Sequence, residues 1–290
     1  MSESVMLVRY GEIFLKSSWV RKSFTDKLAS NIKHRLSLNG VEASVAVIRH
    51  GLIVKTEEIN PRILSETADV FGVKTVYHAL EAKANMEVLK RECLELAGIH
   101  LEGGRSFAVR ARRTKDFPAT SMEIERKLGA EIQGSYGNPV DLENPDVTFH
   151  VQVINEYAYL SGEKVAGIGG LPYGTQGRLL ASVKQSNDLY AVWLMMRRGA
   201  RVDVHCRQEL IGEAGELGKY ADGEIKITAG KETKLKECME NRDYLGLVLG
   251  VQADEAVSFM NNHGIDYPVY LPLSGIPDSV ENPLPERDYR

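Results

Sequence analysis

The first sixty residues combine a helical and a stranded hydrophobic pattern. Residues 20–36 carry an apolar side chain at every fourth position, which predicts a helix with one buried stripe. A short apolar run at 5–8 predicts a strand before it. The alternation over 41–47, followed by Gly51 and the apolar run 52–54, predicts a β-hairpin after it. Ser17 or Ser18 is suited to cap the helix, and Asn39-Gly40 to end it. We therefore expect an α+β module over residues 1–60.

A second α+β unit is predicted over residues 61–166. Helical periodicity is found at 62–71, 86–97 and 120–133. Period-two alternation predicts strands at 107–112 and 147–153, and Asn155-Glu156 is placed to turn the latter into a hairpin with 157–160.

The chain then changes character. Residues 167–177 contain five glycines and a proline, which is typical of a linker without regular structure. Residues 178–290 alternate predicted strands and helices: strands at 179–183, 200–205, 245–249 and 267–271, helices at 186–198 and 253–263. Alternation of this kind favours an α/β Rossmann-like domain with a parallel sheet. The proline-containing C-terminal tail is expected to be loosely ordered.

Composition narrows the class of protein. With 36 basic and 40 acidic residues the net charge is −4, and 43% of residues are hydrophobic, which fits a globular protein and excludes a basic nucleic-acid coat protein. We expect no membrane association, because apolar runs stay far below the length of a bilayer span, and a cytoplasmic location, because no secretory signal is recognisable. Three cysteines without a Cys-x-x-Cys pair and seven scattered histidines predict neither disulfides nor a metal site.

The net charge conceals local basic clusters. Residues 1–60 carry a net charge of +3, residues 61–165 carry −3 and residues 166–290 carry −4. Residues 105–115 nevertheless contain five basic residues and no acidic residue. Such clusters are suited to contact phosphates, although a solvated charged face explains the pattern equally well. The candidate RNA-binding residues are Lys16, Arg21, Lys22, Arg110, Arg112, Arg113 and Lys115.

The loop after the strand at 179–183 lies where α/β sheets commonly bind phosphate. Its residues are Val183, Lys184, Gln185, Ser186, Asn187 and Asp188. Because glycine is absent and Asp188 brings negative charge, an ordinary phosphate cradle is not expected here.

Several motifs, in the same order along the chain, resemble those of the tRNA 4-thiouridine synthetase family, which is also called the ThiI-like tRNA sulfurtransferase family. Members of that family also supply sulfur to thiamine biosynthesis. They are RYGEIFLK at 9–16, FAVRARR at 107–113, LGA at 128–130, VDLENPDV at 140–147, GIGGLPYGTQG at 167–177 and WLMMRRG at 193–199. The resemblance covers nearly the whole chain. It implies a ferredoxin-like domain at 1–60, a THUMP RNA-binding domain at 61–166, the linker at 167–177 and a PP-loop domain at 178–290.

The resemblance also implies tRNA binding, activation of a uridine with ATP and sulfur delivery from a protein persulfide. The chain departs from the family at the nucleotide loop, because residues 183–188 replace a Ser-Gly-Gly-x-Asp-Ser motif, with Asn187 at the aspartate position. Relative to the family, the chain also stops before the region of the catalytic cysteine. No catalytic residue is therefore assigned.

The leading hypothesis is a tRNA-binding protein with a degenerate PP-loop that assists tRNA modification through a partner. The first alternative is an active ATP-dependent tRNA sulfurtransferase with a partner sulfur donor, in which Lys184 contacts a phosphate. ATP is a cofactor only on that alternative. The second alternative is a structural or dimerising C-terminal domain, with the stretch 193–196 in a core or an interface. A homodimer is an expectation from the resemblance alone.

Overall fold

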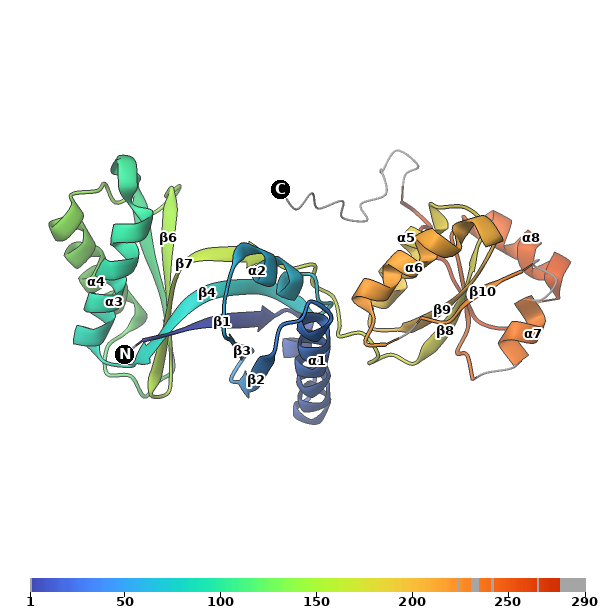
Figure 1. Cartoon of the computed structure of the whole chain (residues 1–290), viewed down its shortest axis with the longest axis horizontal. Coiled ribbons are helices and arrows are strands. Elements are labelled where there is room, and N and C mark those ends of the chain that lie inside the picture. Colours follow the sequence, from blue (N-terminus) through green and yellow to red (C-terminus); the bar gives the residue numbers. More distant parts are fainter. Residues whose placement is uncertain (1, 224, 231–234, 241–242, 265, 277–290) are drawn as a thin grey trace. The chain divides into compact units, whose positions relative to one another are not determined.

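Two β-sheets organise the residues described by the computed structural model, which are 2–223, 225–230, 235–240, 243–264 and 266–276 (Figure 1). They belong to two compact units. The first unit contains the chain up to residue 9 together with 40–68 and 75–166. The second unit contains 10–39, 69–74 and the described residues from 167 onward.

The elements follow one another as strands and helices of ordinary length. The strands are β1 (Glu3–Tyr10), β2 (Ala43–Ile48), β3 (Gly51–Thr56), β4 (Val73–Lys83), β5 (Phe107–Arg113), β6 (Val147–Ile154), β7 (Tyr157–Ala166), β8 (Arg178–Val183), β9 (Arg201–Cys206), β10 (Ile227–Ala229), β11 (Leu247–Leu249) and β12 (Val269–Tyr270). The α-helices are α1 (Ser18–Leu38), α2 (Pro61–Ala68), α3 (Met86–His100), α4 (Ser121–Tyr136), α5 (Asp188–Arg197), α6 (Ile211–Glu216), α7 (Leu235–Glu240) and α8 (Ala253–His263). The 3₁₀ turns within the described residues are η1 (Glu12–Leu15), η2 (Glu102–Gly104), η3 (Gln208–Leu210) and η4 (Leu217–Tyr220).

The larger sheet has the order β2-β3-β1-β4-β7-β6-β5 and is mixed, since β5 runs parallel to β6 while β6 and β7 form an antiparallel hairpin. Asn155 adopts a φ of 55° at the turn of that hairpin. On β5 the apolar residues Phe107, Val109 and Ala111 share a core with residues of α3 and α4. The arginines between them therefore face the opposite side of the sheet.

Helix α4 illustrates how local sequence sets an element boundary. The Thr120 hydroxyl accepts the Glu123 amide while the Glu123 carboxylate accepts the Thr120 amide, which completes a capping box. Gly137 ends the helix in the left-handed conformation, with φ 70°. These local signals set the two ends of α4.

The smaller sheet has the order β10-β9-β8-β11-β12, and all its described pairings are parallel. Both of its faces are covered, as expected for a parallel sheet. Alternate residues of β8 enter different cores: Leu179 and Ala181 pack with α5 and α6, whereas Leu180 packs with α7 and α8 (Figure 1).

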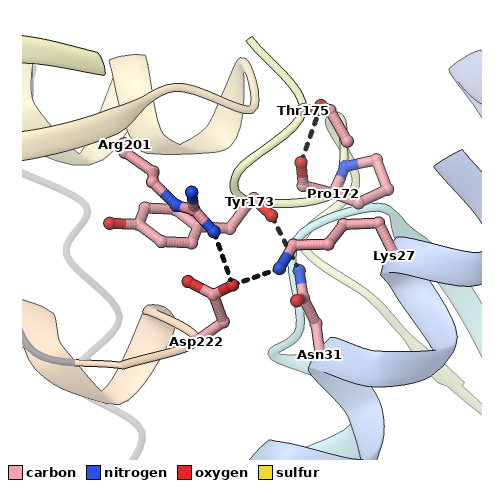
Figure 2. Close-up of polar contacts among 7 residues, drawn as sticks. All are labelled: Lys27, Asn31, Pro172, Tyr173, Thr175, Arg201 and Asp222. Carbon is pink, nitrogen blue, oxygen red and sulfur yellow. Dashed lines mark hydrogen bonds and ion pairs between the residues drawn. The ribbon is translucent and has the colours of Figure 1, made fainter. Parts of the chain in front are cut away.

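Helix α1 belongs to the second unit and is held there by polar contacts (Figure 2). Asn31 donates to the carbonyl oxygen of Tyr173, at 3.1 Å, and Lys27 pairs with Asp222. Arg201 reaches the same Asp222 oxygen at 3.1 Å. Burial acts to raise the pKa of Asp222, but the two cations outweigh it and lower that pKa. Asp222 is therefore ionised and joins the helix to the α/β layer.

Most predicted elements are confirmed, including the helix over 20–36, the hairpin at β2 and β3, and the alternating elements from β8 onward. The α+β and parallel α/β fold classes are confirmed as well. Strand β4 was not predicted, nor were the short β10, α6 and α7. The predicted tail beyond residue 276 lies outside the described residues.

Gly170 provides a test of the linker packing. It has a φ of 82°, and a Cβ there would collide with the Arg197 carbonyl oxygen and lie 2.7 Å from its Cγ. We expect Gly170→Ala to destabilise the second unit by about 1–3 kcal/mol more than Gly264→Ala. Gly264 also has a positive φ, of 57°, but nothing lies within 4 Å of its added Cβ.

Thermal unfolding followed by tryptophan fluorescence measures this difference, because Trp19 and Trp193 both belong to the second unit. Equal losses in the two variants would mean that backbone conformation alone, rather than the contact with Arg197, requires glycine at 170.

Candidate functional site

The candidate basic residues of the first unit centre on β5. Arg110 and Arg112 are exposed on the sheet face turned away from α3 and α4. Parallel pairing with β6 sets Arg110 beside His150 and Arg112 beside Gln152. The Arg110 guanidinium donates to the Leu142 carbonyl oxygen, which fixes the position of its charge. Two strands thus present a continuous polar row.

The pKa of His150 reflects the positive charge on this face of the sheet. Burial, followed by the positive charges of Lys164, Arg112 and Arg110, lowers the pKa of His150 to about 4. The ring lies 5.1 Å from that of Tyr77 on β4. A neutral histidine surrounded by cations indicates a positive local potential, which suits an anionic ligand.

Arg113 and Lys115 do not extend this row in the same way. The Arg113 guanidinium donates to the carbonyl oxygens of Thr114 and Lys115, at 3.3 and 2.9 Å, and so braces the loop after β5. Lys115 is exposed in that loop. The structure therefore unites Arg110 and Arg112 with His150 and Lys164, which the sequence did not indicate because the pairing of β5 with β6 is not local.

The other candidate cations, Lys16, Arg21 and Lys22, lie at the start of α1 in the second unit. Arg21 donates to the carbonyl oxygens of Phe14 and Lys16, at 3.1 and 2.9 Å. Lys22 is exposed and Lys16 is half-buried. These residues form a second cationic cluster, distinct from the row on β5.

The candidate nucleotide loop, residues 183–188, joins β8 to α5. Its backbone amides already have an acceptor: the Asp188 carboxylate accepts from the amides of Lys184 and Gln185, at 2.8 and 3.3 Å. The Gln185 side-chain amide lies 3.4 Å from the other carboxylate oxygen. In a phosphate-binding loop such amides point to the ligand. Here a carboxylate of the chain itself takes that place.

Asp188 is held firmly in this position. It is 3% exposed, and burial raises the pKa of its carboxyl, although the amides of Lys184 and Gln185 oppose that change. Gly250, which follows β11, packs against it so closely that an added Cβ would lie 2.8 Å from the Asp188 Cα. The ammonium group of Lys184 lies 4.4 Å from the centre of the Phe259 ring.

A cavity of about 270 Å³ opens beside this loop at the carboxyl ends of β8 and β9. Its lining includes Ser182, Lys184, His205, Cys206 and Arg207. Burial, and then the nearby Glu209, raise the pKa of Cys206, which favours the protonated thiol. The Cys238 sulfur lies 3.9 Å from His205 Nδ1. The cavity is thus lined by two cations, Lys184 and Arg207, and is large enough for a small ligand.

Among the described residues, no three His, Cys, Asp or Glu side chains are grouped as metal ligands. Within the same residues, no helix is both long and apolar enough to cross a bilayer.

Sequence families match two successive parts of the chain. The ThiI ferredoxin-like domain matches residues 5–76, and the THUMP domain matches residues 83–163. The protein is therefore a THUMP-domain protein.

Relatives extend the similarity through the α/β layer. The chain is 34% identical over 213 residues to a probable tRNA sulfurtransferase of Methanocaldococcus jannaschii, covering 69% of this chain and 55% of the relative. It is 30% identical to a tRNA sulfurtransferase of Thermoplasma volcanium, and the match covers 93% of this chain and 64% of the relative. The chain belongs to the ThiI-like tRNA sulfurtransferase family, and spans about half to two thirds of the length of these curated relatives.

Solved structures agree on the fold. The structure of PH1313 from Pyrococcus horikoshii matches with a TM-score of 0.83 and 28% identity, over 95% of this chain and 96% of that one. A 4-thiouridine synthetase in complex with RNA and ATP matches with a TM-score of 0.75 and 22% identity, over 94% and 81%. The domain limits at 60, 166 and 177 stay predictions.

The depressed pKa of His150 makes the stability of the first unit depend on pH. An unfolded histidine titrates near 6.5, whereas the folded ring stays neutral down to about pH 4. The unfolded state thus binds more protons between these values, so stability is complete above about pH 6.5 and falls as the pH drops toward 4. NMR titration of the His150 ring protons should give a midpoint near 4.

Replacing Arg110 and Arg112 together by Gln should raise that midpoint, because two positive neighbours are removed. Arg126→Gln, on the helix α4 that covers the other face, provides the control. A wild-type midpoint near 6.5 would contradict the burial and charge described for this ring.

Proposed function

We propose that this protein binds tRNA and assists its modification without normal ATP pyrophosphatase chemistry. The observation that carries tRNA binding is the polar row of Arg110, Arg112, His150 and Lys164 on one face of the sheet. This row lies within or directly beside the residues that match the THUMP domain. Relatives are tRNA sulfurtransferases, and a structural neighbour is a 4-thiouridine synthetase crystallised with RNA.

The contacts with RNA are expected to be electrostatic and shape-dependent. Arginines on an exposed strand present guanidinium groups to phosphates, and A-form RNA is recognised mainly by shape and backbone. The cluster of Lys16, Arg21 and Lys22 and the loop residues Arg113 and Lys115 supply further positive charge. Affinity should therefore decrease steeply with salt.

Loss of the pyrophosphatase chemistry is supported by Asp188. Its carboxylate accepts from the Lys184 and Gln185 amides, so a nucleotide phosphate on this loop would have to displace a buried acid. The phosphate and the Asp188 carboxylate would both be negative and would compete for the same amides, and like charges repel strongly in a partly desolvated site. The loop of residues 183–188 is accordingly proposed to be structural.

The second candidate is an active ATP-dependent tRNA sulfurtransferase with a partner sulfur donor. The cavity of about 270 Å³ favours it, because Lys184 and Arg207 place two cations at the carboxyl ends of parallel strands. The third candidate, a structural or dimerising domain, has less support for an interface at 193–196, since Trp193 and Met196 are 5% and 0% exposed in the core.

The first test is tRNA binding measured at several salt concentrations. Arg110→Gln combined with Arg112→Gln should weaken binding by about tenfold or more and reduce the salt slope by about two, because two phosphate contacts are lost. Arg126→Gln on the opposite face should leave both quantities unchanged. An affinity that does not respond to salt, or no affinity for structured tRNA, would overturn the proposal.

The second test uses calorimetry with ATP and magnesium on the same purified sample that binds tRNA. We expect no heat of nucleotide binding in the wild type, because Asp188 occupies the loop amides. tRNA-dependent release of pyrophosphate, abolished by Lys184→Ala, would instead establish the sulfurtransferase candidate. The tRNA measurement shows that the sample is folded and active in binding.

A further inference from the structure

Three large apolar side chains are exposed within one short stretch of the second unit. They follow one another through η1 and into the first turn of α1, and their exposed fractions are 50% for Phe14, 82% for Leu15 and 80% for Trp19. Single exposed apolar residues are ordinary, but a cluster of this kind marks a binding surface.

The surroundings of this cluster are positively charged. Lys16 and Lys22 flank Trp19 in the chain, and the sequence contains no acidic residue from 13 to 25. The carboxylate of Glu12, which lies just before the stretch, pairs with Arg198 at 3.2 Å. The exposed apolar side chains therefore belong to a cationic stretch of the chain, which disfavours a basic partner and favours an anionic one.

Arg21 holds the stretch in a defined conformation. Its guanidinium donates to the carbonyl oxygens of Phe14 and Lys16 and lies 5.4 Å from the centre of the Phe14 ring. The backbone between them is thereby braced against the second turn of α1. A surface that is ordered before binding loses less conformational entropy when a ligand arrives.

From these observations we infer that Trp19 is a stacking platform for unpaired bases of RNA, with Lys16 and Lys22 contacting the adjoining phosphates. Exposed aromatic faces interleaved with cations are the means by which proteins hold single-stranded nucleotides. A duplex exposes base faces only at its two end pairs, so the platform discriminates in favour of unpaired nucleotides. The inference rests on the proposed binding of tRNA and adds to it a second, non-electrostatic contact.

Intrinsic fluorescence tests the inference directly. The chain has two tryptophans, of which Trp193 is 5% exposed in the core and Trp19 is 80% exposed. Titration of the full chain with a duplex RNA bearing an unpaired 3′ overhang should quench Trp19. A blunt duplex of the same length and sequence should leave the emission nearly unchanged.

Variants then separate stacking from charge. Trp19→Ala should weaken binding of the overhang RNA by about tenfold and leave binding of the blunt duplex unchanged, because one base contact is lost. Trp19→Phe should retain most of the affinity. Leu38→Ala removes another exposed apolar side chain, 61% exposed at the far end of the same helix, and should change neither value.

Each remaining outcome is decisive. Wild-type affinity of Trp19→Ala for both RNAs would overturn the platform while leaving the proposed tRNA binding intact. Absence of RNA binding by the wild type would overturn the proposed function and the platform together. If the wild type self-associates in sedimentation experiments and Trp19→Ala does not, while RNA binding is unchanged, the surface binds a second copy of the chain and the inference is overturned.

Discussion

The second unit depends on one shared acceptor, the Asp222 carboxylate. It receives Lys27 from α1 and Arg201 from β9, while Asn31 on the same face of α1 binds the carbonyl oxygen of Tyr173 in the linker (Figure 2). Because Asp222 is 15% exposed, its charge is costly without both partners and its lowered pKa reflects their presence. This arrangement makes α1, from the early part of the sequence, a structural component of the α/β layer.

The loop at 183–188 likewise depends on one carboxylate, that of Asp188, which is hydrogen-bonded by backbone amides of the same loop. The Lys184 and Gln185 amides have the geometry of an anion site, but their anion is the carboxylate of Asp188. Burial of that group raises its pKa, while the amides supply the hydrogen bonds that make the charged form tolerable. Gly250 permits the close approach that completes the contact. The Lys184 and Gln185 amides therefore find their acceptor within the chain. A loop that does not wrap around a phosphate does not need the glycines that such a cradle requires.

Sequence patterns predicted the elements whose signals are local. Helix α4 has its complete capping box, and β5 alternates cleanly between core residues and arginines. Strand β4 escaped prediction because its buried residues recur at Val73, Val76, Ala79 and Ala82, a spacing of three that places successive buried residues on opposite faces of the sheet. The membership of α1 in the second unit was equally hidden, since its partners lie more than 140 residues away.

The candidate site was predicted only as far as it depends on one strand. Arg110 and Arg112 follow from the alternation of β5, but His150 and Lys164 join them through strand pairing that no local pattern encodes. Their proximity has a cost, because the three cations repel one another and add to the burial that lowers the pKa of the His150 ring. An anion bound on this face would offset that repulsion and raise the histidine pKa, so ligand binding and protonation of His150 must favour each other. The net charge of −4 is irrelevant to this coupling, which depends on charges within a few ångströms of the ring.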